Sequence, residues 1–193
     1  MKGSMKIGIV IGVIVIVFLM MMGGGYNSLV GIREDVKASF SQIDNQLQRR
    51  NDLIPNLVST VKQYAAQEEE IFIGVSEARA KLAGATTVAE QAEGDAALNS
   101  ALGRLLAISE NYPELKSNQN FIQLQDELAG TENRIAVARQ DYNAKVKVFN
   151  ERVQKFPTLL YAGLLGFDKA DYFEVAEGAK ENPDVGDLFE DKE

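Results

Sequence analysis

From Leu29 to Tyr64 the apolar residues recur in alternating steps of three and four, and the positions between them are mostly Gln, Asp, Asn, Arg and Lys. This period places the apolar side chains along one face of an α-helix that packs against other helices. The pattern therefore predicts a helix over about residues 26–64. Its apolar face consists of Leu29, Val36, Phe40, Ile43, Leu47, Ile54, Leu57, Val61 and Tyr64.

Two shorter helices are expected next. Acidic residues 68–70 fit the first turn of a second helix, where the helix dipole favours negative charge, and this helix runs to about Leu82 and stops at Gly84. A third helix fits about residues 88–111, because Pro113 disfavours helical backbone at the residue before it. The apolar side of this third helix consists of Leu98, Leu102, Leu105, Leu106 and Ile108.

The fourth predicted helix covers about residues 118–156, is about as long as the first, and is closed by Pro157. Two long and two short helices with short connections favour an antiparallel up-down four-helix bundle. The alternative is a bundle of three helices, with the first unbroken from Tyr26 to Leu82. The apolar face of the fourth helix consists of Phe121, Leu124, Leu128, Thr131, Ile135, Ala138, Tyr142, Val146, Phe149 and Val153.

An uncharged apolar run, Ile7–Gly25, precedes these helices and is close to the ~20 residues that a helix needs to cross a bilayer. A signal peptide is the alternative, but its apolar core is usually only ~7–15 residues long and ends at a small-residue cleavage site. We favour a single transmembrane helix that contacts the lipid bilayer through residues 7–25. Lys and Arg are nearly balanced on the two sides of the run, so the side that holds the rest of the chain stays open.

Composition excludes several kinds of chemistry. The chain has 193 residues and no Cys, His or Trp, so it has no imidazole base, no thiolate nucleophile and no zinc site of the usual ligand set. Its net charge is −8, and the part after residue 25 is more acidic still, because Lys2 and Lys6 precede it without any acid. We therefore expect no nucleic-acid partner and no cofactor, and we assign no catalytic or metal-binding residue.

The stretch Leu47–Val58, LQRRNDLIPNLV, interrupts the apolar face of the first helix. Arg50 takes a position on that face where a leucine is expected. Pro55 removes a helix hydrogen bond and clashes with the carbonyl group one turn earlier, so a kink is expected near Asn51. This is the strongest local departure from the helical pattern in the chain.

Antiparallel packing of the first and fourth helices brings a second polar interruption to the same level. With Tyr26 opposite Phe156, Arg50 lies opposite Glu132, in the polar stretch 130–133. The sequence thus predicts a buried or half-buried polar layer of Arg49, Arg50, Asn51, Asp52, Pro55, Glu132 and Asn133.

Three interpretations of this polar layer are open. We favour a structural role, in which polar residues at a core position fix how the helices pair. The second interpretation is a recognition site for a carboxylate, a lipid head group or a partner helix. The third is acid-base catalysis, although no nucleophile or metal-ligand set accompanies the charges.

After Pro157 the chain changes character. Residues 158–173 form an apolar segment that is too short to span a bilayer, and residues 174–193 form an acidic tail with the composition of a disordered segment. The apolar segment either caps the open end of the bundle or docks among lipid head groups. In the docking role the membrane-surface contacts are Tyr26, Leu159, Leu160, Tyr161, Leu164, Leu165 and Phe167.

The half of the bundle nearest the membrane has only the first and fourth helices. Two helices cannot bury both of their apolar faces, so this half is expected to pair with another copy of the chain or with the apolar segment.

Three separated motifs carry a family resemblance: YNSLVGIREDVKASFSQIDNQLQRRNDLIPNLVSTVKQY, YPELKSNQNFIQLQDELAGTENRIAVARQDYN and FPTLLYAGLLGF. In this order behind an N-terminal anchor, they resemble the LemA family of bacterial membrane proteins over nearly all of residues 26–173. The resemblance implies a four-helix bundle behind one transmembrane helix in the bacterial cell membrane, with no established molecular activity and a role in membrane organisation. The family often has His-Glu where this chain has Gln67-Glu68, which puts any role of that histidine in doubt here.

Two functions are expected from these features. The first is a structural or scaffolding protein at the bacterial envelope, with residues 1–25 as its anchor and residues 26–157 as its bundle, that forms a homo-oligomer. The second is an adaptor that recruits another membrane protein or lipid through the Arg50 layer or the C-terminal segment. An enzyme is the least favoured class, because His and Cys are missing.

Overall fold

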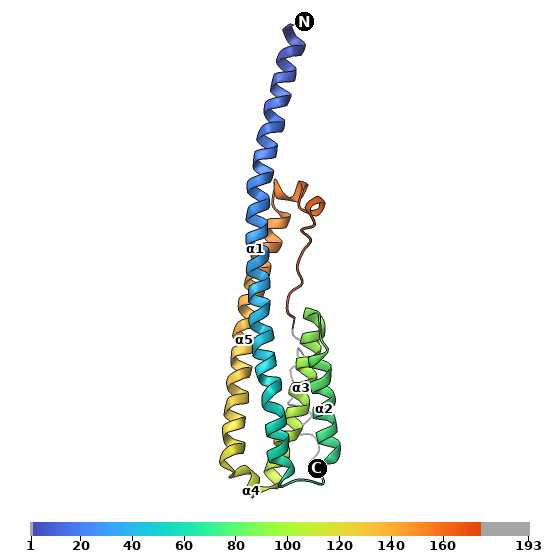
Figure 1. Cartoon of the computed structure of the whole chain (residues 1–193), viewed down its shortest axis with the longest axis vertical. Coiled ribbons are helices and arrows are strands. Elements are labelled where there is room, and N and C mark those ends of the chain that lie inside the picture. The colour runs from blue at the N-terminus through green and yellow to red at the C-terminus, as the bar shows by residue number, and fades with distance from the viewer. Residues whose placement is uncertain (1, 175–193) are drawn as a thin grey trace, which may run out of the picture. The chain divides into compact units, whose positions relative to one another are not determined.

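Helices make up most of the chain, which is described over residues 2–174 in a computed structural model (Figure 1). No strand occurs within this range, so the predicted all-α class is confirmed. Except for Glu174, the predicted acidic tail lies outside the described residues. The elements in chain order are α1 (Lys2–Lys62), α2 (Glu69–Ala83), α3 (Val88–Ile108), η1 (Ser109–Asn111), α4 (Pro113–Lys116), α5 (Gln119–Gln154), η2 (Thr158–Leu160) and η3 (Gly163–Leu165), where η marks a 3₁₀ turn.

The boundaries of α2 and α3 follow the sequence signals. α2 has two acids in its first turn and ends at Ala83, directly before its cap residue Gly84, and α3 begins at Val88. The three-helix alternative is wrong, because α1 ends at Lys62 and the chain turns through residues 63–68 before α2. The short helix α4 was not predicted; Pro113 begins it, at a position where a missing backbone N–H leaves no helix hydrogen bond unmade.

Helix α1 joins the predicted anchor to the first predicted helix without a break. It passes through Gly23–Gly25 and through Pro55, and the kink expected near Asn51 stays a prediction. The large apolar side chains of residues 7–17 and 19–21 are 48–74 % exposed. By length and composition this part of the helix could cross a membrane.

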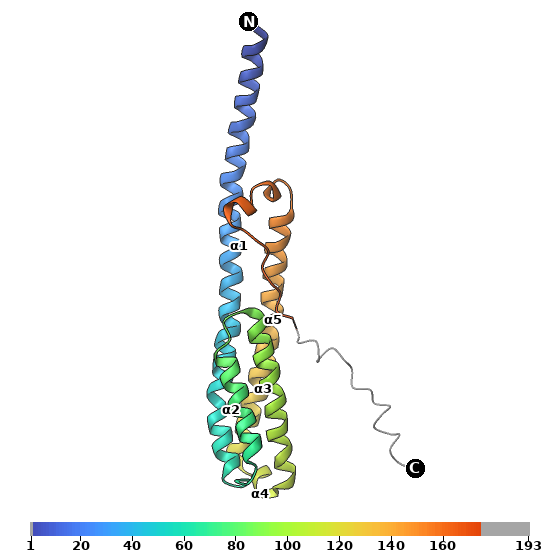
Figure 2. The ribbon, with the colours of Figure 1, turned by 90° about the vertical axis from the view of Figure 1, so that its right-hand side faces the viewer.

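The chain divides into two compact units, and α1 and α5 contribute to both. The hairpin unit comprises residues 45–135 and continues from Phe173, whereas the span unit comprises residues 1–44 and 136–172. In the hairpin unit most side chains of the predicted apolar faces are buried, with Tyr64, Leu106 and Leu124 half-buried. Helices α2 and α3 lie side by side (Figures 1 and 2). The side chains of this core include Leu47, Ile54, Leu57, Val61, Leu98, Leu102, Leu105, Phe121, Leu128 and Ile135, all at most 6 % exposed.

A capping box and one close backbone contact build the α2–α3 hairpin. The Thr87 hydroxyl accepts a hydrogen bond from the backbone N–H of Glu90, and the Glu90 carboxylate accepts one from the backbone N–H of Thr87. Gly94 lets the two helices approach, since a Cβ at this position would lie 2.8 Å from the Cα of Leu82. Any larger residue there would push α2 and α3 apart.

Side chains also join the two turns at the end of the hairpin unit. Asn118 Nδ2 donates to the Tyr64 hydroxyl at 2.9 Å, and Gln67 Nε2 donates to the Tyr112 hydroxyl at 2.7 Å. Burial and the neighbouring Glu68 carboxylate raise the pKa of Tyr112. Gln67 thus has a contact of its own at the place where the family often has histidine.

In the span unit the chain after η3 runs back along α5 (Figure 2). The amide side chain of Asn150 donates to the carbonyl oxygen of Ala170 and accepts from its N–H, at 2.9 and 2.8 Å. The Tyr142 hydroxyl, whose ring packs on Phe40 at 5.6 Å, donates to the carbonyl oxygen of Asp171. Of the two partners expected for this half of α1 and α5, the structure shows the apolar segment and the residues that follow it.

Loss of the capping box should destabilise the hairpin unit. We expect Thr87→Ala to lower its free energy of unfolding by about 1 kcal/mol, because a backbone N–H at the start of α3 loses its acceptor. Urea unfolding of the full-length protein in detergent, followed by helical circular dichroism, measures the change. Ser100→Ala, at an exposed position of the same helix, is the matched control and should cause no loss.

The capping box also predicts a pH dependence. The backbone N–H groups of Thr86 and Thr87 donate to the Glu90 carboxylate and lower its pKa from 4.5 to about 2. Because the folded-state pKa is the lower one, this stabilisation is complete above the unfolded pKa and is lost as the pH falls through the folded pKa. Unfolding of the unchanged protein between pH 4.5 and about 2 should therefore show a loss of stability that Glu90→Gln reduces.

Candidate functional site

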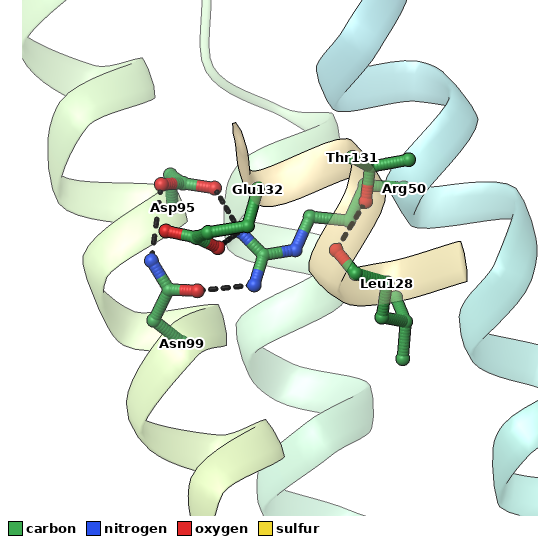
Figure 3. Close-up of polar contacts among 6 residues, drawn as sticks. All are labelled: Arg50, Asp95, Asn99, Leu128, Thr131 and Glu132. Atoms are coloured by element: carbon green, nitrogen blue, oxygen red, sulfur yellow. Dashed lines mark hydrogen bonds and ion pairs between the residues drawn. The ribbon is translucent and has the colours of Figure 1, made fainter. Parts of the chain in front are cut away.

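Arg50 is a buried charge that joins α1 to α3 and α5 (Figure 3). Its side chain is only 5 % exposed. Its Nη1 lies 3.1 Å from Oδ1 of Asp95 and 2.7 Å from Oε2 of Glu132, and its Nη2 donates to Oδ1 of Asn99. We call these four residues the Arg50 cluster.

Two members of the cluster, Asp95 and Asn99, were not predicted from the sequence. The Asp95 side chain is 1 % exposed, and Asn99 Nδ2 donates to its Oδ2 at 3.2 Å from one turn further along α3. Asp95 falls three residues before Leu98 and four after Gln91, on the buried face of α3. A charged residue on an apolar face is the same signal that singled out Arg50, so this signal could have found Asp95.

The structure brings Arg50 and Glu132 together, at the pairing that antiparallel first and fourth helices require. Glu132 remains 47 % exposed along its side chain and therefore forms the open edge of the cluster. Beside it, Thr131 is fully buried, and its hydroxyl donates to the carbonyl oxygen of Leu128 at 2.8 Å (Figure 3). The polar atom of Thr131 is thus satisfied within α5.

The other residues of the predicted layer lie outside the cluster. Arg49 is 3.7 Å from Glu127, and both side chains are more than half exposed. Asn51 accepts a hydrogen bond from Arg79 Nε at 3.2 Å, which links α1 to α2. Three residues of the predicted set are exposed: Asp52, Pro55 and Asn133.

The arrangement of charges limits what the Arg50 cluster can bind. Both terminal nitrogens of the guanidinium already contact side chains of the cluster. Two carboxylates accompany the single positive charge, so an incoming anion meets net negative charge. This geometry favours the structural interpretation over a recognition site for a carboxylate, and the structural role stays a prediction.

A second candidate site is the uncharged stretch of residues 156–167, which overlaps the predicted segment 158–173 and is called the apolar segment from here on. Two aromatic side chains hold it against α1. Tyr161 is 2 % exposed, and a Cβ built on Gly25 would overlap its hydroxyl. Phe167 is equally buried, meets the ring of Tyr26 edge-on at 5.6 Å, and lies 3.8 Å below the guanidinium of Arg33. Arg33 also donates to the carbonyl oxygen of Gly166 at 2.8 Å.

Two of the predicted membrane contacts, Tyr161 and Phe167, are buried in the structure. Tyr161 and Phe167 cannot touch lipid while they pack on α1, so they position the segment instead. Tyr26 is 44 % exposed. The remaining large apolar side chains of the segment are open: Phe156 78 %, Leu159 60 %, Leu160 57 %, Leu164 88 % and Leu165 37 % exposed.

Comparison with known proteins identifies the family of the chain. The sequence profile of the LemA family matches residues 39–186. The chain belongs to the LemA family. It is 30 % identical over 200 residues to magnetosome proteins MamQ 1 and MamQ 2 of Paramagnetospirillum magneticum, with 90 % of this chain and 74 % of each relative covered. It is 23 % identical over 173 residues to protein LemA of Metamycoplasma hominis, with 89 % and 79 % covered.

The LemA profile covers both candidate sites, since the Arg50 cluster and the apolar segment fall between residues 39 and 186. It begins inside α1, after the apolar run Ile7–Gly25. The family resemblance inferred from three motifs is therefore confirmed. Together with the candidate span of α1, membership of the LemA family indicates a membrane-associated protein.

Removing the arginine of the cluster should be costly. We expect Arg50→Leu to lower the free energy of unfolding by ~3–5 kcal/mol, because it leaves the buried Asp95 carboxylate without a cation. Urea unfolding measures the loss. The neighbouring Arg49→Leu is the matched control, because its exposed ion pair contributes only about 0–1 kcal/mol.

A double variant then separates two free energies: the destabilisation by an unpaired buried charge and the net stabilisation by the ion pair. Arg50→Leu combined with Asp95→Leu should recover most of the stability that either change removes, since no isolated charge stays buried. If Arg50→Leu alone is as stable as Arg49→Leu, the cluster is not the structural element inferred here.

Close contact at Gly25 should hold the apolar segment in place. We expect Gly25→Ala to displace the Tyr161 ring, because the new methyl group overlaps its hydroxyl. Amide hydrogen exchange over residues 158–167 should then become faster. Gly24→Ala is the matched control, because a Cβ at Gly24 meets no atom within 4 Å, and it should leave the exchange unchanged.

Proposed function

We propose that this chain is a membrane-anchored, non-enzymatic helical-bundle protein that self-associates and has a structural or scaffolding role at the bacterial envelope. Residues 7–25 cross the membrane once in this proposal. The bundle is the antiparallel up-down arrangement of four helices predicted over residues 26–157.

The observation that carries the anchor is the exposed apolar surface of α1. Its large apolar side chains at residues 7–17 and 19–21 are about half exposed or more, and no charged residue follows Lys6 until Arg33. Apolar surface costs ~25 cal/mol per Å² in water, and an exposed run of this length exceeds what soluble proteins usually carry. A bilayer with a hydrocarbon core of ~30 Å covers such a run. The same unbroken helix supplies Arg50 to the hairpin unit.

An apolar stripe on α5 supports self-association. In the span unit, Val137 and Val148 are 65 % and 53 % exposed, and Ala144 between them is also exposed. Spacings of seven and four place these residues on one face of the helix, with the exposed Asp141 among them. The exposed apolar residues of this face suit packing against the same helix of a second copy.

The relatives support a structural role over a catalytic one. Two of them are named as magnetosome proteins, and the family name denotes no reaction. By analogy we assign this chain a part in an assembled structure at the envelope.

An adaptor role is the second candidate. An open groove of about 740 Å³ lies between the end of α1 and the outer face of α2 in the hairpin unit, and it gives this role a surface that the sequence did not predict. Because both terminal nitrogens of Arg50 already contact side chains of the cluster, the groove and the apolar segment remain for recruitment of another membrane protein or lipid. The groove is lined by Lys62, Ala66, Glu69, Phe72, Ile73, Ser76, Glu77 and Ala80.

Self-association can be measured on the full-length chain of 21.2 kDa in lipid nanodiscs by native mass spectrometry. We expect masses of two or more copies, and fewer copies for a Val137→Glu, Val148→Glu variant. Ile73→Glu, an exposed apolar residue of the hairpin unit, is the control and should not change the mass distribution. A strictly monomeric mass contradicts self-association.

Crosslinking in native membranes that captures a second protein favours the adaptor role, and capture of the chain alone argues against it.

A further inference from the structure

We propose that the apolar segment is a second membrane contact, in which Leu159, Leu160 and Leu164 insert among the lipids at the surface where α1 leaves the bilayer. In this proposal the three leucines contact the outer edge of the acyl-chain region, just below the lipid head groups. The inference rests on the anchoring by residues 7–25 proposed above.

The contacts on α1 set the level of this segment. From Ile7 to Gly25 the helix rises ~28 Å, close to the ~30 Å of the hydrocarbon core, so Gly25 lies at its edge. Arg33, the first charge after Lys6, lies ~12 Å further along the helix, at or beyond the head groups. The stretch of α1 between Gly25 and Arg33 is therefore the part that crosses the interface.

The apolar segment packs on that same stretch. Tyr161 lies against Gly25, and Phe167 lies between Tyr26 and Arg33. The first contact lies at the membrane end of the interfacial part of α1, and the second extends from Tyr26 beside it to Arg33 at the far end. Because these side chains contact α1 directly, the position of α1 across the bilayer also fixes the depth of the segment.

The two sides of the segment differ sharply in exposure. Tyr161, Ala162 and Phe167 are at most 2 % exposed, whereas Leu164 is 88 % exposed. Residues 156–167 include no charged side chain, and Lys155 and Asp168 bound them. Segments that are rich in leucine and aromatic residues and lack charged side chains bind at the boundary between head groups and acyl chains.

Lipid fits this surface better than a second copy of the chain. The exposed leucines stand on two 3₁₀ turns of three residues each, η2 and η3, which provide no stripe for a partner helix. A bilayer needs no complementary shape, and the apolar surface of α1 that it already covers continues to Gly25.

The absence of cysteine from the sequence makes a depth measurement simple, because each introduced cysteine is the only one. The full-length protein, with a fluorescent probe on Leu164→Cys, is placed in phosphatidylethanolamine–phosphatidylglycerol vesicles whose acyl chains carry a shallow nitroxide quencher. We expect several-fold stronger quenching at this position than at Val137→Cys, which is also exposed in the span unit.

A third label, Ile14→Cys, reports the anchor separately. Quenching at Ile14 without quenching at Leu164 overturns the inference and leaves the anchor intact. Quenching at neither position overturns the anchor as well. Protection of the Leu164 probe from aqueous iodide without lipid quenching also overturns the inference, because it shows that protein covers the leucines.

Gly25→Ala provides a second variant that leaves the exposed leucines unchanged. Because this change displaces Tyr161, we expect quenching at Leu164 to fall at least several-fold, with quenching at Ile14 unaltered. Gly24→Ala should leave both values as they were. Equal quenching at Leu164 in the two glycine variants overturns the part of the proposal that assigns depth to the Gly25 contact.

Discussion

The hairpin unit depends on one constraint: the charge of Arg50 lies out of water and needs partners there. An ion removed from water costs several kcal/mol unless opposite charge and hydrogen bonds compensate it. Asp95 and Asn99 on α3 and Glu132 on α5 contact its two terminal nitrogens. We therefore expect this one side chain of α1 to fix the level of two other helices. The position of α2 follows from the capped loop between α2 and α3 and from the close approach of Leu82 to Gly94.

Much of this could be predicted from the sequence because helical period decides which side chains are buried. The level of Arg50 and Glu132 followed from two helices of about equal length that run antiparallel. Asp95 was missed because the third helix was judged by its leucines alone, and a polar residue on an apolar face does not name its partner 45 positions away. Helix α4 was missed because four residues are too few to show a period.

The apolar segment shows a different limit of sequence reasoning. Its composition could not decide between a cap and a membrane contact, because a short uncharged stretch without periodicity has no assigned inner and outer side. In the structure, contacts over long separations assign the two sides: Tyr161 and Phe167 face α1, while Leu159, Leu160 and Leu164 remain open. Three consecutive glycines likewise do not reveal that the third lies against a tyrosine hydroxyl.

Apolar contacts alone would leave the pairing of α1 with its neighbours poorly specified. Ile54, Leu57 and Val61 are similar in size, so a slip of one heptad would exchange one aliphatic contact for another at small cost. Because α1 and α3 run parallel, a slip of α1 toward its C-terminal end would set Ile43 against the buried Asp95 carboxylate and bring the guanidinium of Arg50 to the level of Leu102. Two unpaired buried charges would result, and each destabilises the fold by more free energy than a methylene contact contributes. An ion pair that adds little net stability can therefore still select one register of helix pairing. Every other register separates its two charges and is less stable by the cost of leaving them buried and unpaired.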